Sequence, residues 1–102
     1  MNSQGNGQPA PYAVKLSEQL KATIRQLHQE VAQRGEGQQF LDAPRVIHDR
    51  LRKDPGGFGE PLFHLPALKL LVCLAVVSPV VVEFAVHQER PLVFLRIVKV
   101  LG

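Results

Sequence analysis

The stretch "LKLLVCLAVVSPVVVEFAV", residues 68 to 86, decides the fold, because it is long enough either to cross a membrane as one helix or to form two strands. Lys69 and Glu83 place charges in this stretch, and charge inside a bilayer is costly. Its many valines are β-branched and suit a pleated strand better than a helix. Ser78 and Pro79 form a turn signal near its middle. The stretch therefore predicts a β-hairpin, with a membrane helix as the alternative.

A further strand is predicted after this hairpin. The polar break "HQERP", residues 87 to 91, is followed by the β-type run "LVFLRIVKVL", residues 92 to 101. We expect an antiparallel meander with strands near 68–77, 80–87 and 92–101, joined by short turns. The first strand is almost continuously apolar, so we expect it to be central and covered on both faces or nearly so.

The first half of the chain predicts two helices. Ser17 can cap the first, which runs to the "GEG" stop at residues 35 to 37. Asp42 can cap the second, with Pro44 in its first turn and its end before "DPGG" at residues 54 to 57. Apolar residues recur at helical spacing in both segments. They are Leu16, Leu20, Ile24, Leu27 and Val31 in the first, and Phe40, Ile47 and Leu51 in the second.

Together these elements predict an α+β domain. It comprises a short N-terminal strand from "YAVKLS" at residues 12 to 17, a two-helix hairpin, and a three-stranded antiparallel meander, with the helices covering one sheet. At 102 residues the chain is large enough for one modest core. We expect a disordered tail over residues 1–11 and a single domain over residues 12–102.

Composition restricts the function classes. The net charge of +3 permits contact with nucleic acid or an acidic protein without requiring either. The polar N-terminus "MNSQGNGQPAP" lacks the apolar core of a signal peptide, so we expect a cytoplasmic protein. The single cysteine, Cys73, excludes an internal disulfide and a multi-cysteine zinc module. We expect it to behave as a small apolar residue within a strand.

The order of elements, together with one motif, resembles the RelE/ParE toxin superfamily of bacterial toxin–antitoxin systems. In that family a strand of the type Tyr-x-Val-x-x-Ser opens the domain, as "YAVKLS" does here. The second helix then ends in Leu-x-x-Asp-Pro, with Gly and Pro-Leu shortly after. The segment "LRKDPGGFGEPL", residues 51 to 62, reproduces this pattern at Leu51, Asp54, Pro55, Gly59, Pro61 and Leu62.

This resemblance implies a small cytoplasmic toxin that is held inactive by a cognate antitoxin protein. RelE-like members cut mRNA on the ribosome without a metal or other cofactor, and ParE-like members inhibit DNA gyrase. The sequence departs from the nuclease pattern, because the strand after Pro-Leu usually carries Arg and the next turn is followed by Tyr-Arg. The corresponding segments here read "LKLLVCLAVVS" and "PVVVEF". The resemblance therefore provides no catalytic residue for this chain.

A few residues remain as candidates for contact with RNA. Lys69, Arg96 and Lys99 lie in or beside predicted strands, where they could hold RNA phosphates or, alternatively, protect the rim of the sheet from aggregation. His64, in the predicted loop "FHLP", is a weak candidate for a general base. The four histidines have no metal-ligand spacing, so we expect no metal site.

Three function hypotheses follow from these observations. The first, which we favour, is a toxin-fold protein that acts mainly by binding protein, whether an antitoxin or a target such as gyrase, with mRNA cleavage reduced or absent. The second is a ribosome-dependent endoribonuclease with a rearranged basic site. The third is a small membrane-associated protein, which the charged and proline-broken apolar stretch disfavours.

Overall fold

The stretch that decides the fold forms two antiparallel strands, β4 (Leu70–Val77) and β5 (Val80–His87), with Ser78 and Pro79 at the turn. β6 (Leu92–Val100) pairs antiparallel with β5, as expected. These elements belong to a computed structural model that describes residues 11–35 and 37–101, so the predicted tail lies almost wholly outside it. Within those ranges no helix is long and apolar enough to cross a membrane.

Two shorter strands complete the sheet, which has the order β2-β6-β5-β4-β3. β2 (Ala13–Lys15) pairs parallel with β6, which confirms the strand expected from "YAVKLS". β3 (Glu60–Leu65) pairs antiparallel with β4, and a one-turn 3-10 helix, η1 (Pro66–Leu68), connects them. The antiparallel meander therefore has four strands, β3 to β6, and the prediction of three strands is wrong. Prolines at both ends make this segment look like a loop, but an edge strand tolerates them.

The two predicted helices are present. In α1 (Glu18–Gln33) the Ser17 hydroxyl accepts a hydrogen bond from the Leu20 amide at 3.0 Å, which confirms the predicted cap. α2 (Gly37–Lys53) starts before Asp42, so the predicted second cap is wrong and Pro44 lies inside the helix. An internal proline removes one helical hydrogen bond, and packing of the following turns against the sheet offsets that loss. The side chain of Phe40 lies outside the described residues.

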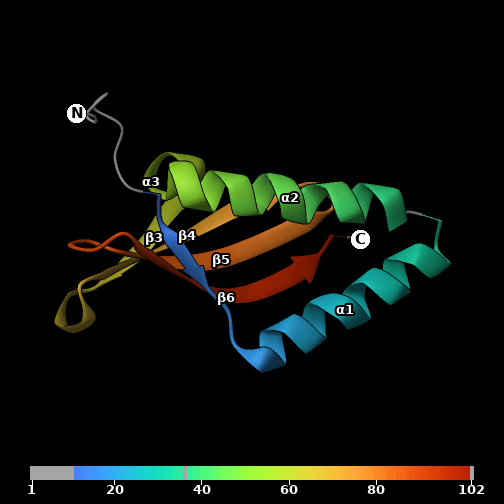
Figure 1. Ribbon diagram of the computed structural model, residues 1–102, viewed down its shortest axis with the longest axis horizontal. Coiled ribbons are helices and arrows are strands. Elements are labelled where there is room, and N and C mark those ends of the chain that lie inside the picture. Colours follow the sequence, from blue (N-terminus) through green and yellow to red (C-terminus); the bar gives the residue numbers. More distant parts are fainter. Residues whose placement is uncertain (1–10, 36, 102) are drawn as a thin grey trace.

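Both helices pack on one face of the sheet, which gives the α+β architecture shown in Figure 1. α2 lies over β4 and β5, and α1 diverges from it toward β6. The core between helices and sheet is built from alternating strand residues and the apolar stripes of the two helices. It contains Leu20, Val31, Ala43, Ile47, Leu51, Cys73, Ala75, Val80, Val82, Phe84, Val86, Val93 and Val98.

The expectation for β4 is only half right. It lies between β5 and β3, but β5 occupies the middle of the sheet. Val72 and Cys73 of β4 are fully buried, whereas Val76 on the face without helices is 55% exposed. An apolar strand can therefore form here although its second face is covered only in part.

The segment that carries the family resemblance has a structural role. Asp54 accepts a hydrogen bond from the Gly57 amide at 3.1 Å and caps the short helix α3 (Pro55–Phe58). The Phe58 ring stacks on Phe84 with centroids 5.8 Å apart. The Arg50 guanidinium lies over the same Phe58 ring, 5.0 Å from its centroid. The motif therefore ties the end of α2 to the centre of the sheet.

At Gly59 a side chain would meet both backbone and a core ring. A Cβ placed there would lie 2.8 Å from Phe84 Cζ and 2.9 Å from the Leu74 carbonyl oxygen. We expect Gly59→Ala to lower the free energy of unfolding by about 1–3 kcal/mol, because the backbone must move to relieve the overlap. Gly56→Ala is the matched control, since a Cβ there meets nothing within 4 Å. Denaturant titration of both variants measures the difference, and equal stability would contradict this packing.

Candidate functional site

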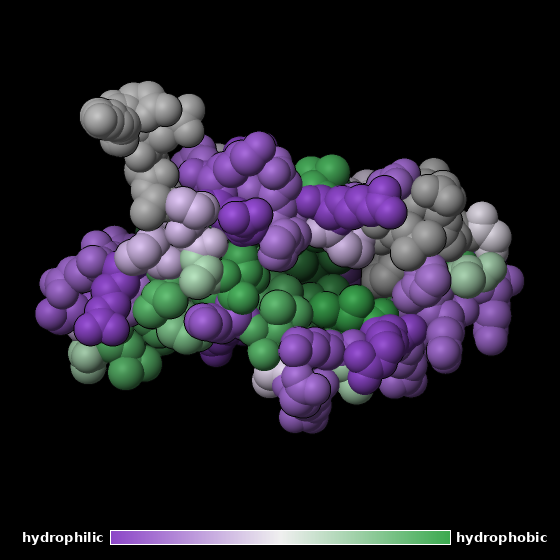
Figure 2. Space-filling view, viewed as in Figure 1, coloured by the Kyte–Doolittle hydropathy of each residue, from purple (hydrophilic) through white to green (hydrophobic). Residues whose placement is uncertain are grey.

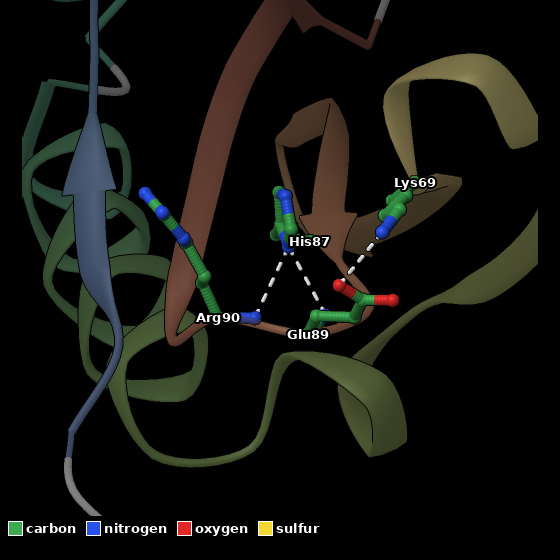
Figure 3. Close-up of polar contacts among 4 residues, drawn as sticks. All are labelled: Lys69, His87, Glu89 and Arg90. Carbon is green, nitrogen blue, oxygen red and sulfur yellow. Dashed lines mark hydrogen bonds and ion pairs between the residues drawn. The ribbon is translucent and has the colours of Figure 1, made fainter.

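Lys69 follows η1 at the turn into β4, in a left-handed backbone conformation. Its Nζ lies 2.9 Å from Glu89 Oε1, on the turn between β5 and β6 (Figure 3). The backbone of that turn is fixed by His87, whose Nδ1 accepts hydrogen bonds from the Glu89 amide at 3.0 Å and the Arg90 amide at 3.1 Å. The Lys69 carbonyl also accepts from the Gln88 amide at 2.8 Å. Lys69 thus joins two neighbouring turns at one end of the sheet.

Arg96 lies on β6 where the pairing with β5 is irregular. Leu95 is opposite Phe84 and Ile97 is opposite Glu83, so Arg96 is the extra residue of a bulge. Its Nη1 lies 3.6 Å from Glu83 Oε2. The Glu83 side chain is only 18% exposed, whereas that of Arg96 is 42% exposed. The ion pair therefore supplies the partly buried carboxylate with a compensating charge.

Lys99 is exposed on β6, opposite Val81 near the start of β5. The turn that carries Lys69 lies at the other end of the sheet, where Leu70 is opposite His87 (Figure 1). Positions 81 and 87 of β5 are six residues apart, which corresponds to about 20 Å along a strand. One phosphate group cannot contact both lysines. The three predicted cations are therefore spread along the sheet, and two of them already have carboxylate partners.

His64 was expected in a loop, but it lies in the edge strand β3, opposite Leu71. By strand alternation Leu71 belongs to the face that carries the helices, because it packs against the core cluster. Lys99 is opposite Val81 and so belongs to the other face. The predicted base and this predicted phosphate contact therefore lie on opposite sides of the sheet.

The part of the chain in the structure contains no group of three or more His, Cys, Asp or Glu side chains that could hold a metal ion. Cys73 is fully buried in β4, as expected for a small apolar residue. Burial raises the pKa of its thiol, because the thiolate loses solvation. A thiol with a raised pKa is a poor nucleophile at neutral pH.

The sequence did not reveal the character of the outer face, the sheet face that carries no helix. Strand register places the odd-numbered positions of β5 there, and their cross-strand neighbours on β4 and β6 are mainly apolar. Exposed large apolar residues on this face are Phe63 (46%), Val76 (55%), Phe94 (36%) and Ile97 (39%). The alternation of side chains in "LVFLRIVKV" indicates part of this apolar face, but the bulge at Arg96 interrupts the alternation.

Such a surface suits protein binding better than phosphate binding. An apolar patch of several large side chains loses ordered water when a partner covers it, whereas a phosphate needs several positive charges directed at one point. The Glu83–Arg96 pair and Lys99 are set among apolar side chains of the outer face. Aromatic residues and Arg, both present on this face, are enriched in protein interfaces.

Comparison with known proteins adds no assignment. No protein-family model, curated protein sequence or solved structure matches this chain.

Proposed function

We propose that this protein is a RelE/ParE-like toxin-fold component of a toxin–antitoxin system that acts mainly through protein binding, with mRNA cleavage reduced or absent. Its partners are a cognate antitoxin and, in the active state, a protein target such as DNA gyrase. The observation that carries the proposal is the apolar outer face, where Phe63, Val76, Phe94 and Ile97 are exposed together.

The arrangement of cations supports binding over cleavage. Metal-free cleavage of RNA needs positive charge at the developing phosphorane and a base near the 2′-hydroxyl. Lys69 and Arg96 are each paired with a carboxylate, and Lys69 and Lys99 lie at opposite ends of the sheet. Losing one such contact commonly reduces a rate by about 10² to 10³. We therefore expect at most weak ribosome-dependent cleavage.

The proposal predicts a stable complex with a small protein encoded by the neighbouring open reading frame. Co-expression of the two reading frames should yield an equimolar complex that survives gel filtration. We expect production of this protein alone to slow growth, and co-production of the neighbour to restore it. Absence of a complex, together with normal growth in both cases, would contradict a toxin–antitoxin role.

The cause of any growth defect separates the two remaining functions. Growth arrest with intact mRNA and accumulation of relaxed or broken chromosomal DNA would favour a gyrase-type target. Arrest with codon-phased mRNA cuts would instead favour the endoribonuclease alternative, with Lys69, Arg96 and Lys99 as its first candidate residues. Alanine substitution of those three residues is then the control.

A further inference from the structure

The turn between β5 and β6 is held by a histidine whose hydrogen bonds depend on its protonation. His87 is half-buried, and its Nδ1 accepts hydrogen bonds from the amides of Glu89 at 3.0 Å and Arg90 at 3.1 Å (Figure 3). A ring nitrogen accepts only through the lone pair that it has when it carries no proton. Both hydrogen bonds therefore require the neutral imidazole, with its proton on Nε2.

Protonation of His87 would reverse the role of Nδ1 in this turn. In the imidazolium both ring nitrogens are donors, so an N–H group would point at two backbone N–H groups. The two amides would lose their acceptor, and the net contribution of one such hydrogen bond corresponds to about two- to tenfold in an equilibrium constant. The closed turn and the protonated ring are therefore incompatible.

The same turn connects other parts of the sheet. The Gln88 amide donates to the Lys69 carbonyl at 2.8 Å, and Lys69 Nζ lies 2.9 Å from Glu89 Oε1, which ties the turn to the start of β4. The Ala13 amide donates to the Pro91 carbonyl at 2.8 Å, which ties it to the start of β2. A change in the turn can therefore reach both strands.

Solvent reaches this end of the sheet, which lies at the left in Figure 1. Gln88, Glu89 and Arg90 are all exposed, and Figure 2 shows hydrophilic residues gathered at this end. Protons thus have access to the ring, and water can replace the acceptor that the amides lose on opening. Opening of the turn needs no change in the buried core.

The charges nearest to His87 also disfavour a protonated ring in the closed turn. Figure 3 shows the His87 side chain between those of Lys69 and Arg90, which are both positive. Glu89 is the nearest carboxylate, but it is paired with Lys69. An imidazolium can take Glu89 as its partner only by competing with Lys69, and that competition weakens the tie to β4.

The other elements around His87 bring no closer ionisable group. Leu70, its neighbour across the strands on β4, is apolar. Glu83 lies four residues earlier on the same face of β5, about 13 Å away. His64 belongs to the opposite face, and Lys15 lies on β2, beyond β6. The response of the turn to pH is therefore expected to come from His87 itself.

We propose that His87 is a pH-sensitive latch of the β5–β6 turn. With the neutral imidazole the turn is closed onto the starts of β4 and β2. Binding of a proton at Nδ1 releases the Glu89 and Arg90 amides and opens the turn. The inference concerns this turn alone, so it stands whether or not the outer face binds a target.

Nuclear magnetic resonance titration of the full chain from about pH 8 to about pH 5 tests the proposal, because histidine changes its charge in this range. We expect the Glu89 and Arg90 amide protons to move toward the shifts of solvated amides in step with the His87 ring. Their protection against hydrogen exchange, corrected for the intrinsic effect of pH, should fall about fivefold or more. The Gln88 and Ala13 amides should follow. Titration of the ring without change at the Glu89 and Arg90 amides would overturn the proposal.

Substitution of His87 separates the latch from an unrelated titration. In His87→Asn the Oδ1 atom is bonded to Cγ as Nδ1 is, and Asn side chains commonly accept from backbone amides that follow in a turn. This variant should keep the turn closed at every pH, whereas His87→Ala should leave it open at every pH. Thermal melting checks the fold of both.

His64→Asn is the matched control, because it removes an exposed histidine from the other face of the sheet. We expect this control to retain the full response of the Glu89 and Arg90 amides to pH. Loss of the response in both His87 variants, but not in the control, would support the latch. A response that persists in either His87 variant, or that disappears in His64→Asn, would overturn it.

Discussion

Val82→Asp and Phe84→Asp should each abolish cooperative unfolding. Val82 is 1% exposed and Phe84 is fully buried in the middle strand β5, where Phe84 also stacks on Phe58. An aspartate at either position would have to bury a charge or take up a proton, and both outcomes cost several kcal/mol. A domain of this size is commonly stable by only about 5–15 kcal/mol, so little or no folded protein should remain.

Thermal melting followed by circular dichroism measures this effect. The matched control is Val76→Asp, which introduces the same charge on β4 at a position that is 55% exposed. We expect this control to melt cooperatively, within a few degrees of the wild type. Cooperative melting of all three variants near the wild-type temperature would mean that the helices do not cover the Val82 and Phe84 face.

Charge on the outer face should strongly weaken binding of the proposed protein partner while the fold remains intact. Phe94 and Ile97 are 36% and 39% exposed, so Glu at both positions can remain solvated in the free protein. In a complex the same carboxylates would be desolvated inside an apolar contact. Central interface residues commonly contribute about 2 kcal/mol or more, so we expect the Phe94→Glu, Ile97→Glu variant to bind at least about 30-fold more weakly.

Titration calorimetry with the product of the neighbouring open reading frame measures that loss. Lys53→Glu is the control, because it makes the same change of −2 in net charge at an exposed position on α2, away from the outer face. We expect the control to bind within about threefold of the wild type. Similar losses in both variants would indicate a general charge effect, and unchanged binding in the Phe94 and Ile97 variant would place the partner elsewhere.

The fold could be predicted where local chemistry and tertiary packing agree. Ser78 and Pro79 mark the turn and the valines on either side form the hairpin, so β4 and β5 agree with the prediction within two residues at each end. β3 was missed because its stability comes from pairing with β4, not from its own sequence, which contains Pro61. The start of α2 was missed because Pro44 is favourable in a first turn, whereas here packing holds it inside the helix.

The candidate site could be predicted only in part. Lys69, Arg96 and Lys99 lie in or beside strands as expected, but their separation depends on strand direction and on the bulge at Arg96. Neither feature has a clear local signature. The ion pair between Lys69 and Glu89 could not be predicted either, because the two residues are distant in sequence and only the fold brings their turns together. The outer face follows from alternation in β4, β5 and β6 once the helices are known to cover the opposite side.

The most direct test of binding over cleavage is to map mRNA 5′ ends in a reconstituted translation system that contains the purified protein. The Lys69→Ala, Arg96→Ala, Lys99→Ala triple variant is assayed in parallel. We expect no codon-phased cuts above background in either reaction, because the three cations do not converge on one phosphate. Abundant codon-phased cuts with the wild-type protein that disappear in the triple variant would contradict this expectation and assign those residues to a nuclease site.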